Sequence, residues 1–459
     1  MSPICKAAAM THCNPDSLEF SRLGSQAVIA DFQGGRLTSD TGMLLLREVG
    51  QRLGLFDALD RAIPDPRWLP TVIHDQKSML TQRIIALAAG YEDLNDHQTL
   101  RTDPALQIAA GKTPEDEVKL ASPPTLCRLE NRIERSSLIG IAEVLVEQFI
   151  ASYPEPPEHL ILDFDATDDR IHGHQEGRFF HGYYDSYCFL PLYVFCGEEL
   201  LVSYLRPSKI DACKHTRAVL KLLVQRLRAV WPEVKITIRA DSGFCRWRLM
   251  RWCDSHGIGY VLGLPKNTAL KRLARDEIER AARQFGRTGQ KQRIFGSFGY
   301  AAGTWDRPRR VIVKAEHTAK GANPRFVVTN VPGDPQELYE EVYCQRGEME
   351  NRIKEQQLDL FADRTSCHRL LANQFRLLLS AAAYVLVQAL RRTALRGTEL
   401  ERAQVGTIRL KLFKVAARVK VSVRRVVFHL ATSYPYQAVF REAFARLRNQ
   451  PTSATPETG

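Results

Sequence analysis

The 459-residue sequence predicts an α/β protein in which a mixed sheet lies between two helical regions. Three observations predict this arrangement. Apolar residues recur at helical spacing from about 36 to 150, short β-branched and aromatic runs alternate with amphipathic segments from 158 onward, and helical spacing returns after 366. Because the chain exceeds the usual size of one hydrophobic core, we expect two to four domains.

Five segments follow from these patterns. Residues 1–26 and the tail 449–459 are expected to be disordered, because they have little apolar surface to bury. An all-α region is expected at 27–152, before the break "SYPEPPEH". The remaining segments are a sheet-containing domain at 158–365, with a β-rich insertion at about 270–335, and a helical, basic C-terminal region at 366–448.

The charge balance favours a polyanionic partner. The chain has 64 Lys and Arg against 52 Asp and Glu, a net charge of +12, and nucleic acid is the commonest partner of such proteins. Within the N-terminal region, "PTLCRLENR" fits the second helix of a helix-turn-helix and would offer Thr125, Arg128 and Arg132 to DNA. The alternative is a solvated charged helix face, and the sequence leaves both open. We predict that 27–152 is a DNA-binding region.

The sheet-forming elements begin with the strand "LILDFDA". "SYCFLPLYVFCG" and "ELLVSYLRP" are predicted as two further strands, joined as a hairpin at Gly197 and Glu198. A helix, "HTRAVLKLLVQRLRAVW", leads to the strand "VKITIRADSGF", and the helix "RWRLMRWCDSHG" leads to the strand "GYVLGLP". This order of hairpin, helix, strand, helix and strand predicts a mixed sheet with helices on its faces.

The later segments alternate in type. Short β-like runs with Gly and Pro, "IFGSFGYAAGTWDRPRRVIVKAEH" and "PRFVVTNV", predict the β-rich insertion, and "QELYEEVYCQRGEMENRIKEQQLDL" predicts a long helix. The apolar run at 377–390 is too short to span a bilayer, so we expect a core helix and no membrane association. The helical C-terminal region includes "RLKLFKVAARVKVSVRR", a basic run without acidic residues.

Aspartates stand at the ends of two predicted strands. Asp163 and Asp165 alternate along one strand, so their side chains project to the same side, and Asp241 ends another. Such carboxylates can share Mg²⁺, and a pair of ions roughly 3.5–4 Å apart would stabilise the attacking and leaving oxygens of a phosphodiester transfer. The alternative is that each Asp caps the following turn, and we prefer this alternative for Asp168 and Asp169.

The long helix predicted at 337–357 offers a third carboxylate. At about 100° per residue, one helix face collects a Tyr, an Arg, a Glu and a Lys, whereas the other glutamates point elsewhere. The members of this face are Tyr343, Arg346, Glu350 and Lys354. An Arg suits bidentate phosphate contact and a Lys supplies a point charge. The alternative is a row of solvated ion pairs between residues four apart.

Together these stretches resemble the bacterial insertion-sequence DDE transposases whose last motif reads Tyr-x2-Arg-x3-Glu-x6-Lys. The residues that carry the resemblance are "LDFDAT" with Asp165, "RADSGF" with Asp241, and "YCQRGEMENRIKE" with Tyr343, Arg346 and Glu350. "AAGYEDLNDHQTLRTDP", "PTLCRLENR", "RFVVTN" and "DRTSCH" are also typical of these enzymes, so the resemblance covers most of 27–395. It implies a ribonuclease-H-like fold for the sheet domain.

The resemblance implies a catalytic set of Asp165, Asp241 and Glu350 that binds two Mg²⁺ ions, with Mn²⁺ as a substitute. It selects Asp165 because the first catalytic Asp of the family usually stands two residues before a Thr or Ser, here Thr167. Asp163 stays open as a supporting or substitute metal ligand.

The closing Lys of the family motif is missing from this chain. Its position is occupied by Gln357, and Lys354 on the same helical face is the candidate replacement. Trp305, inside the predicted insertion, offers a ring that could stack on an unpaired base, although packing within β structure is the commoner role of such a Trp.

The activity implied by the resemblance is DNA transposition. The enzyme would bind the terminal inverted repeats of its element as a homodimer, cut at the element's ends, and join the 3′-hydroxyl to target DNA. Tyr343, Arg346 and Lys354 would contact the DNA near the metal ions, and Arg128 and Arg132 would contact it elsewhere. Such a protein is expected in the cytoplasm, on the nucleoid.

Two other classes of function compete with this prediction. A haloacid-dehalogenase-type phosphatase shares the opening motif, with Asp163 as nucleophile and Asp165 as general acid. That family normally begins close to this motif, whereas some 160 residues precede it here. The other class is a non-catalytic DNA-binding repressor derived from a transposase, which strand cleavage would distinguish.

Overall fold

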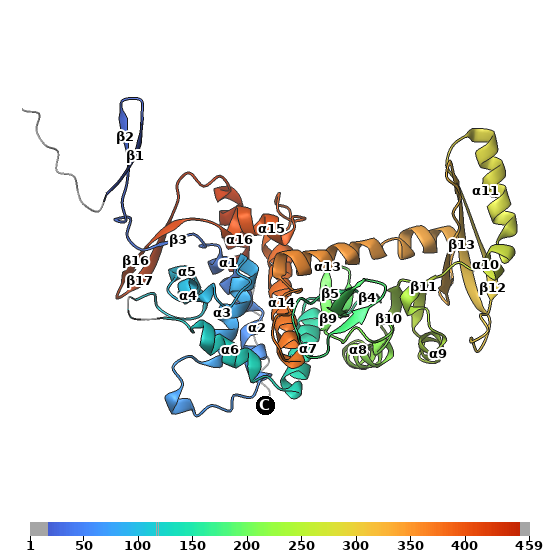
Figure 1. The fold of residues 1–459 in the computed structure, drawn as a ribbon, viewed down its shortest axis with the longest axis horizontal. Coiled ribbons are helices and arrows are strands. Elements are labelled where there is room, and N and C mark those ends of the chain that lie inside the picture. The colour runs from blue at the N-terminus through green and yellow to red at the C-terminus, as the bar shows by residue number, and fades with distance from the viewer. Residues whose placement is uncertain (1–16, 116, 118, 450–459) are drawn as a thin grey trace, which may run out of the picture.

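The computed structural model of the chain describes residues 17–115, 117 and 119–449. A helical body lies at one end, the main sheet lies in the middle, and helices and strands of the insertion form the other end (Figure 1). The body contains β1 (Leu18–Leu23), β2 (Gln26–Ala30), β3 (Leu37–Thr38), α1 (Met43–Arg52), α2 (Leu55–Arg61), α3 (Gln76–Ala89), α4 (His97–Leu100), α5 (Pro104–Ala109), α6 (Pro123–Asn131) and α7 (Arg135–Ala151).

The main sheet has nine strands, in the order β12-β13-β15-β11-β10-β4-β8-β9, with β14 paired to β13. β4 and β10 are parallel, as are β10 and β11, and all other neighbours are antiparallel. The strands are β4 (His159–Ala166), β8 (Leu192–Cys196), β9 (Glu199–Tyr204), β10 (Lys235–Ala240), β11 (Gly259–Leu264), β12 (Gln292–Tyr300), β13 (Arg309–Thr318), β14 (Gly321–Ala322) and β15 (Arg325–Thr329). The large mixed sheet agrees with the predicted fold class.

Helices cover the sheet because its strands are apolar on both faces. Leu162 and Phe164 of β4 belong to one core with Leu220 of α8 (Thr216–Val230) and Leu249 of α9 (Trp247–Ser255). Phe195 of β8 belongs to a second core, together with apolar residues of α14 (Leu370–Leu390) and of the helical body. The main sheet is therefore held between α8 and α9 on one side and α14 on the other.

The remaining elements extend both ends of the molecule. The insertion adds α10 (Thr268–Leu273) and α11 (Arg275–Thr288), and α12 (Pro335–Glu337) leads through a π-helical turn, Leu338–Tyr343, into α13 (Arg346–Leu360). A small three-stranded sheet follows β4 and consists of β5 (Asp169–Arg170), β6 (Phe179–His181) and β7 (Ser186–Phe189). After α14 come α15 (Val405–Ile408), β16 (Ala417–Ser422), β17 (Arg425–Leu430) and α16 (Gln437–Asn449).

Several sequence predictions need correction in the terminal regions. Of the segment 1–26 predicted as disordered, 18–23 forms β1, and residues 1–16 lie outside the described residues, as do residues 450–459 of the tail. The N-terminal region is also not all-α, because β3 pairs with β16. The basic run of the C-terminal region is a strand rather than a helix at 417–422. There, exposed Arg418 and Lys420 alternate with buried Ala417 and Val419, a period of two that belongs to a strand.

The sheet region departs from prediction at two places. "SYCFLPLYVFCG" forms two strands instead of one, because Pro191 has no backbone N–H to continue the ladder. The predicted β-rich insertion contains two helices, and its strands are part of the main sheet, since β15 pairs with β11 in the register Val261–Thr329.

The apolar segment near 377–390 belongs to a longer helix than predicted. Together with its continuation to Leu395, α14 has the length and apolarity of a membrane span, so its length does not exclude one. However, 83% of the residues in its most apolar part are buried inside the protein. Burial, rather than length, supports the prediction of a core helix.

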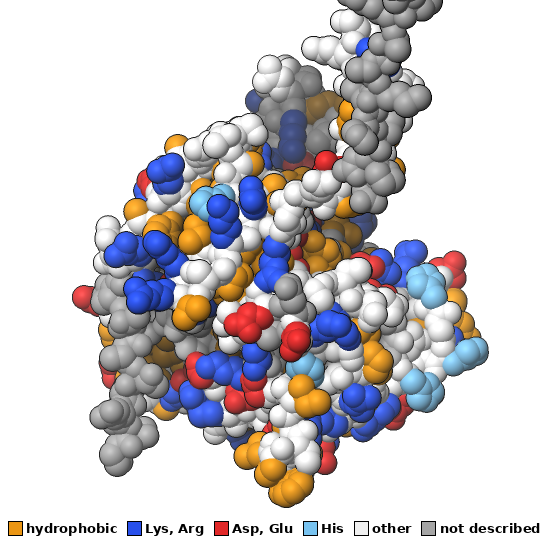
Figure 2. Space-filling model, turned by 90° about the vertical axis from the view of Figure 1, so that its left-hand side faces the viewer, with side chains coloured by type: hydrophobic (Ala, Val, Ile, Leu, Met, Phe, Trp, Pro, Cys, Tyr) orange, Lys and Arg blue, Asp and Glu red, His pale blue; other side chains and the backbone are white. Residues whose placement is uncertain are grey.

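The surface at the helical end carries many cationic side chains. Figure 2 shows Lys and Arg side chains spread over this end, with the Asp and Glu side chains near its middle lying among them. The hairpin β16–β17 contributes exposed cations to the protein surface: Arg418, Lys420, Arg424 and Arg425.

A buried ion pair fixes α13 to the C-terminal region. Glu355 of α13 is almost fully buried and accepts hydrogen bonds from the guanidinium of Arg391 and from the Val405 N–H, at 2.6 Å for the latter. Because α13 also carries Arg346 and Glu350, this contact fixes the helix that brings those side chains to β4.

We expect Glu355→Gln to lower the free energy of unfolding by about 3–5 kcal/mol, because it leaves the buried Arg391 without its carboxylate. Glu348→Gln, on the exposed side of the same helix, is the matched control and should stay within about 0.5 kcal/mol of wild type. Chemical denaturation measures both. Equal stability of the two variants would contradict the anchoring role.

Candidate active site

The two strand-end aspartates lie side by side. In the parallel register of β4 and β10, Phe164 is opposite Ala240, so the next residues, Asp165 and Asp241, follow at the same edge of the sheet. One Asp241 oxygen accepts a hydrogen bond from the Gly243 N–H at 2.8 Å and caps the turn that leads to α9. Asp241 can therefore cap this turn and still belong to the site.

Asp163 has a different role from Asp165. It lies directly opposite Arg239 in the register and is only 2% exposed. Both of its oxygens accept hydrogen bonds from the Arg239 guanidinium, with Nη2–Oδ2 at 2.6 Å, and Arg239 also donates to the carbonyl of Val342. Both oxygens of Asp163 are thus engaged by Arg239, which favours a supporting role for Asp163 over that of a metal ligand or of a phosphatase nucleophile.

The π-helical turn and the start of α13 bring three further side chains to the two aspartates. Arg346 lies between acidic partners, with Nη1 3.7 Å from Asp165 Oδ2 and Nη2 2.6 Å from Glu350 Oε1. Tyr343 is half-buried, and its hydroxyl lies over Gly263 of β11. The predicted face of Tyr343, Arg346 and Glu350 is thus assembled at the end of β4 and β10.

The electrostatics of this cluster are governed by burial and by like charges. Burial, reinforced by Asp241 and Glu350, raises the pKa of Asp165 to about 7, although Arg346 opposes the change. Burial alone would lower the pKa of Arg346, but the carboxylates of Asp165 and Glu350 outweigh it and raise that pKa. Burial also raises the pKa of Tyr343. Arg346 is therefore the counter-ion of the acidic cluster.

The carboxylates suit a hard cation in their chemistry but are not gathered around one point. Within the described parts of the chain, no three His, Cys, Asp or Glu side chains lie close enough together to hold a metal ion. Glu350, which is 44% exposed, is turned to Arg346 by their ion pair. Carboxylate oxygens are nonetheless the ligands that Mg²⁺ prefers, and a nearby cation favours the ionised form of Asp165, as Arg346 already does.

The position of the missing Lys also faces the site. Gln357 donates from Nε2 to the carbonyl of Asp168 at 3.2 Å, on the loop that follows Asp165. Lys354 is exposed. The prediction of Asp169 as a turn residue is wrong, because Asp169 lies in β5, is 2% exposed, and has its pKa raised well above the usual range by burial.

The residues predicted to contact DNA outside this cluster differ in whether their side chains are exposed or already held by other residues. Arg128 is exposed on α6, and its guanidinium donates to the Thr125 hydroxyl on the same helix. Arg132 is instead held by Asp65, 3.2 Å away, and donates to the Gln76 amide, so its prediction as a DNA contact is not supported. Trp305 packs edge-on against Tyr300 in the insertion, with ring centroids 5.4 Å apart, as the packing alternative predicts.

Two residues of the site were not identified from the sequence. Arg239 alternates with Asp241 along β10, so it projects to the same face and could have been paired with Asp163. Gly263 interrupts an apolar strand, which commonly marks close backbone approach. A Cβ there would lie 2.6 Å from the Tyr343 hydroxyl and 2.9 Å from the Ser242 nitrogen. Gly263 is thus required for the packing of Tyr343 beside Asp241.

Comparison with known proteins identifies the family. Over residues 20–452 the chain matches the family described as Transposase DDE domain group 1, and it therefore belongs to this family of DDE transposases. No curated protein matches the chain. Among solved structures, the chain is similar to a piggyBac transposase synaptic complex with hairpin DNA, at 12% identity and a TM-score of 0.41, over 82% of this chain and 80% of that chain. That similarity is too weak to support any inference about this site.

The first prediction from the site separates the two aspartates of β4. Asp163→Asn should lower the free energy of unfolding by about 3–5 kcal/mol, because it leaves buried Arg239 without its carboxylate. Asp165→Asn should not destabilise the metal-free protein at pH 8. At that pH Asp165 is ionised beside other carboxylates, and the neutral amide of Asn removes this repulsion. Denaturation in EDTA measures both.

The pH dependence of the free energy of unfolding gives a further check on Asp165. The folded-state pKa of Asp165, about 7, lies above its ordinary value of 3.8, so the bound proton favours the folded state. This contribution to stability is complete below about pH 4 and is lost as the pH rises to about 7. Asp165→Asn should remove that decline, and an unchanged decline in the variant would contradict the assignment.

The second prediction concerns Gly263. Gly263→Ala should lower stability by about 1–3 kcal/mol, because the new methyl group collides with the Tyr343 hydroxyl and with backbone atoms of Asp241 and Ser242. Gly299→Ala is the matched control in β12 of the same sheet, where a Cβ would meet no atom within 4 Å. Denaturation curves that coincide for the two variants would show that Tyr343 and the backbone of Ser242 do not lie tightly against Gly263.

Proposed function

We propose that this DDE transposase cuts DNA at the ends of its element and joins the 3′ ends to target DNA. The observation that carries the proposal is that Arg346 pairs with both Asp165 and Glu350, at the edge of the sheet where Asp241 ends the neighbouring strand. We further propose that it is of the bacterial insertion-sequence kind with the Tyr-Arg-Glu-Lys signature. Tyr343, Arg346 and Glu350 support this reading, while Gln357 departs from it.

A ribonuclease-H-like catalytic core is part of the proposal. It is supported by the strand order β9-β8-β4-β10-β11, in which three antiparallel strands are followed by two parallel ones. The helices α8 and α9 connect β9 to β10 and β10 to β11. This order brings the ends of β4 and β10 together, although 75 residues separate Asp165 from Asp241 in number, and α13 then adds Glu350 from the other side of the insertion.

Asp165, Asp241 and Glu350 would hold Mg²⁺, or Mn²⁺ in its place, as two ions. When bound, these ions would activate the attacking oxygen and stabilise the leaving oxygen of the phosphodiester. The chain's own side chains have other tasks. Arg346 would bind the scissile phosphate once Glu350 turns from it to the metal, because guanidinium groups form bidentate contacts with phosphate. Asp163 and Arg239 hold the two strands and the Val342 carbonyl in place.

DNA binding is proposed on the same grounds. The net charge of +12 and the exposed cations Arg418, Lys420 and Arg128 provide surface for phosphates. Tyr343 in the π-helical turn and Lys354 in α13 would contact the DNA near the cut. The partners would be duplex DNA with terminal inverted repeats and target DNA, bound by a homodimer. Its place of action would be the cytoplasm, on the nucleoid.

Cleavage of terminal-repeat DNA tests the proposal. Asp165→Asn and Glu350→Gln should each reduce Mg²⁺-dependent cutting by about a hundredfold or more while DNA binding persists, because each removes a charge that positions the cation. Glu348→Gln, two residues from Glu350 and exposed on the same helix, is the control and should cut at the wild-type rate. Gel assays of cleavage and of binding measure the two effects. Wild-type cutting by Asp165→Asn would overturn the proposal, and DNA binding by a wild-type protein that never cuts would favour the repressor.

A further inference from the structure

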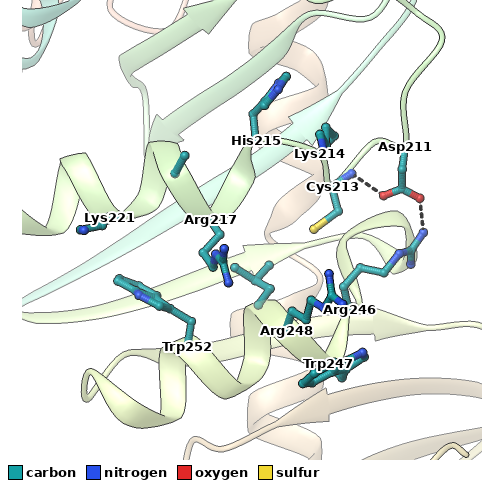
Figure 3. A pocket seen from close by; sticks show the side chains of 12 residues that line it. Asp211, Cys213, Lys214, His215, Arg217, Lys221, Arg246, Trp247, Arg248 and Trp252 are labelled. Carbon is teal, nitrogen blue, oxygen red and sulfur yellow. Dashed lines mark hydrogen bonds and ion pairs between the residues drawn. The ribbon is translucent and has the colours of Figure 1, made fainter. Parts of the chain in front are cut away.

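A cavity lies near the same edge of the sheet as the carboxylates, on the face covered by α8 and α9. It has a volume of about 650 Å³ and opens between the first turns of these two helices and the loop that precedes α8 (Figure 3). Cavities of this size accommodate small organic groups. It is therefore large enough for a nucleotide.

The rim of the cavity is strongly basic. Its lining includes five Lys and Arg side chains and one acidic residue, Asp211. The cations are Lys214, Arg217, Lys221, Arg246 and Arg248. All five are exposed, and Arg246 is the one that pairs with Asp211, at 2.5 Å. The rim thus has an excess of positive charge that suits phosphate groups.

The interior of the cavity is apolar and aromatic. Trp252 of α9 faces the same space as Arg217 of α8 (Figure 3). Its ring is half-buried and stacked on His256, with ring centroids 4.1 Å apart at 20°, so its orientation is fixed before any ligand arrives. Leu249 and Trp247 complete this part of the wall. An apolar interior with an oriented indole and a cationic rim fits a flat base whose phosphates remain outside.

The walls of the cavity are held by buried contacts and begin close to Asp241 in the chain. The fully buried Arg206 donates to the carbonyls of Ala212 and Lys214, which fixes the loop before α8. The opposite wall begins five residues after Asp241, and a Cβ on Gly243 would lie 3.5 Å from Ala212. The turn that follows Asp241 therefore packs against the loop that forms one wall of the cavity.

We propose that this cavity binds an unpaired nucleotide of a DNA strand that also passes the carboxylates, with the base against Trp252 and the neighbouring phosphates on Lys214, Arg217 and Lys221. A paired base stays inside the duplex stack, so only an extrahelical or single-stranded base can enter a recess of this kind. The inference rests on the proposed function, since it takes the same DNA as its ligand.

Binding of oligothymidylate and of its duplex with oligoadenylate tests the inference, by fluorescence anisotropy of the full chain in EDTA. Trp252→Leu, which keeps the site apolar, should weaken binding of the single strand about tenfold and that of the duplex less than about twofold. Arg217→Gln combined with Lys221→Gln should reduce the slope of log K against log salt by about 1.4 for the single strand. Lys235→Gln, at the opposite end of β10, is the control and should change neither quantity.

The outcomes separate this inference from the proposed function. Wild-type protein that binds neither form of DNA would overturn both. Wild-type protein that binds and cuts DNA, with unchanged affinities in the Trp252 and Arg217/Lys221 variants, would overturn the inference alone. Displacement of the strand by thymidine monophosphate or by polyglutamate at equal charge concentration would also overturn it, because a free nucleotide or an acidic peptide would then be the ligand. If Trp252→Leu fails to fold, the salt dependence of the variant with both Arg217→Gln and Lys221→Gln still tests the inference, because both side chains are exposed.

Discussion

The buried pair of Asp163 and Arg239 is the contact on which the rest of the site depends. It joins two parallel strands at opposed positions, and its geometry is bidentate, which fixes both direction and register. A slip of one residue would turn Asp165 or Asp241 to the other face of the sheet, where apolar side chains pack under α8 and α9. The same guanidinium reaches the carbonyl of Val342, so the segment that leads to Arg346 is positioned by the same ion pair.

The structure also explains why the insertion does not separate the parts of the site. Its strands β12, β13 and β15 continue the main sheet from β11, and the chain then returns through a π-helical turn to the end of β4. The long helix α13 spans this return and is fixed at its far end by Glu355 and Arg391. Glu350 is therefore carried by a rigid element, although its own side chain is partly exposed.

Local patterns were sufficient for part of this architecture. The alternation of strands and helices predicted the mixed sheet, and helical spacing predicted that Tyr343, Arg346 and Glu350 share a face. Patterns within one segment could not decide between Asp163 and Asp165, because the difference arises from Arg239 on another strand. The hairpin β16–β17 was missed because its basic residues suggested a helix, whereas alternation of Arg418 and Lys420 with buried neighbours belongs to a strand. The cavity between α8 and α9 needs residues from separate elements and has no signature in either one.

The placement of Arg346 has a consequence for metal loading. Many small metal-binding domains cannot fold until the ion arrives, because the free energy of metal binding supplies their free energy of folding. Here a guanidinium from the chain itself already offsets part of the charge of Asp165 and Glu350. The folded structure therefore holds these carboxylates together with an internal cation. Metal loading at this site would be an exchange of one internal charge for an external one.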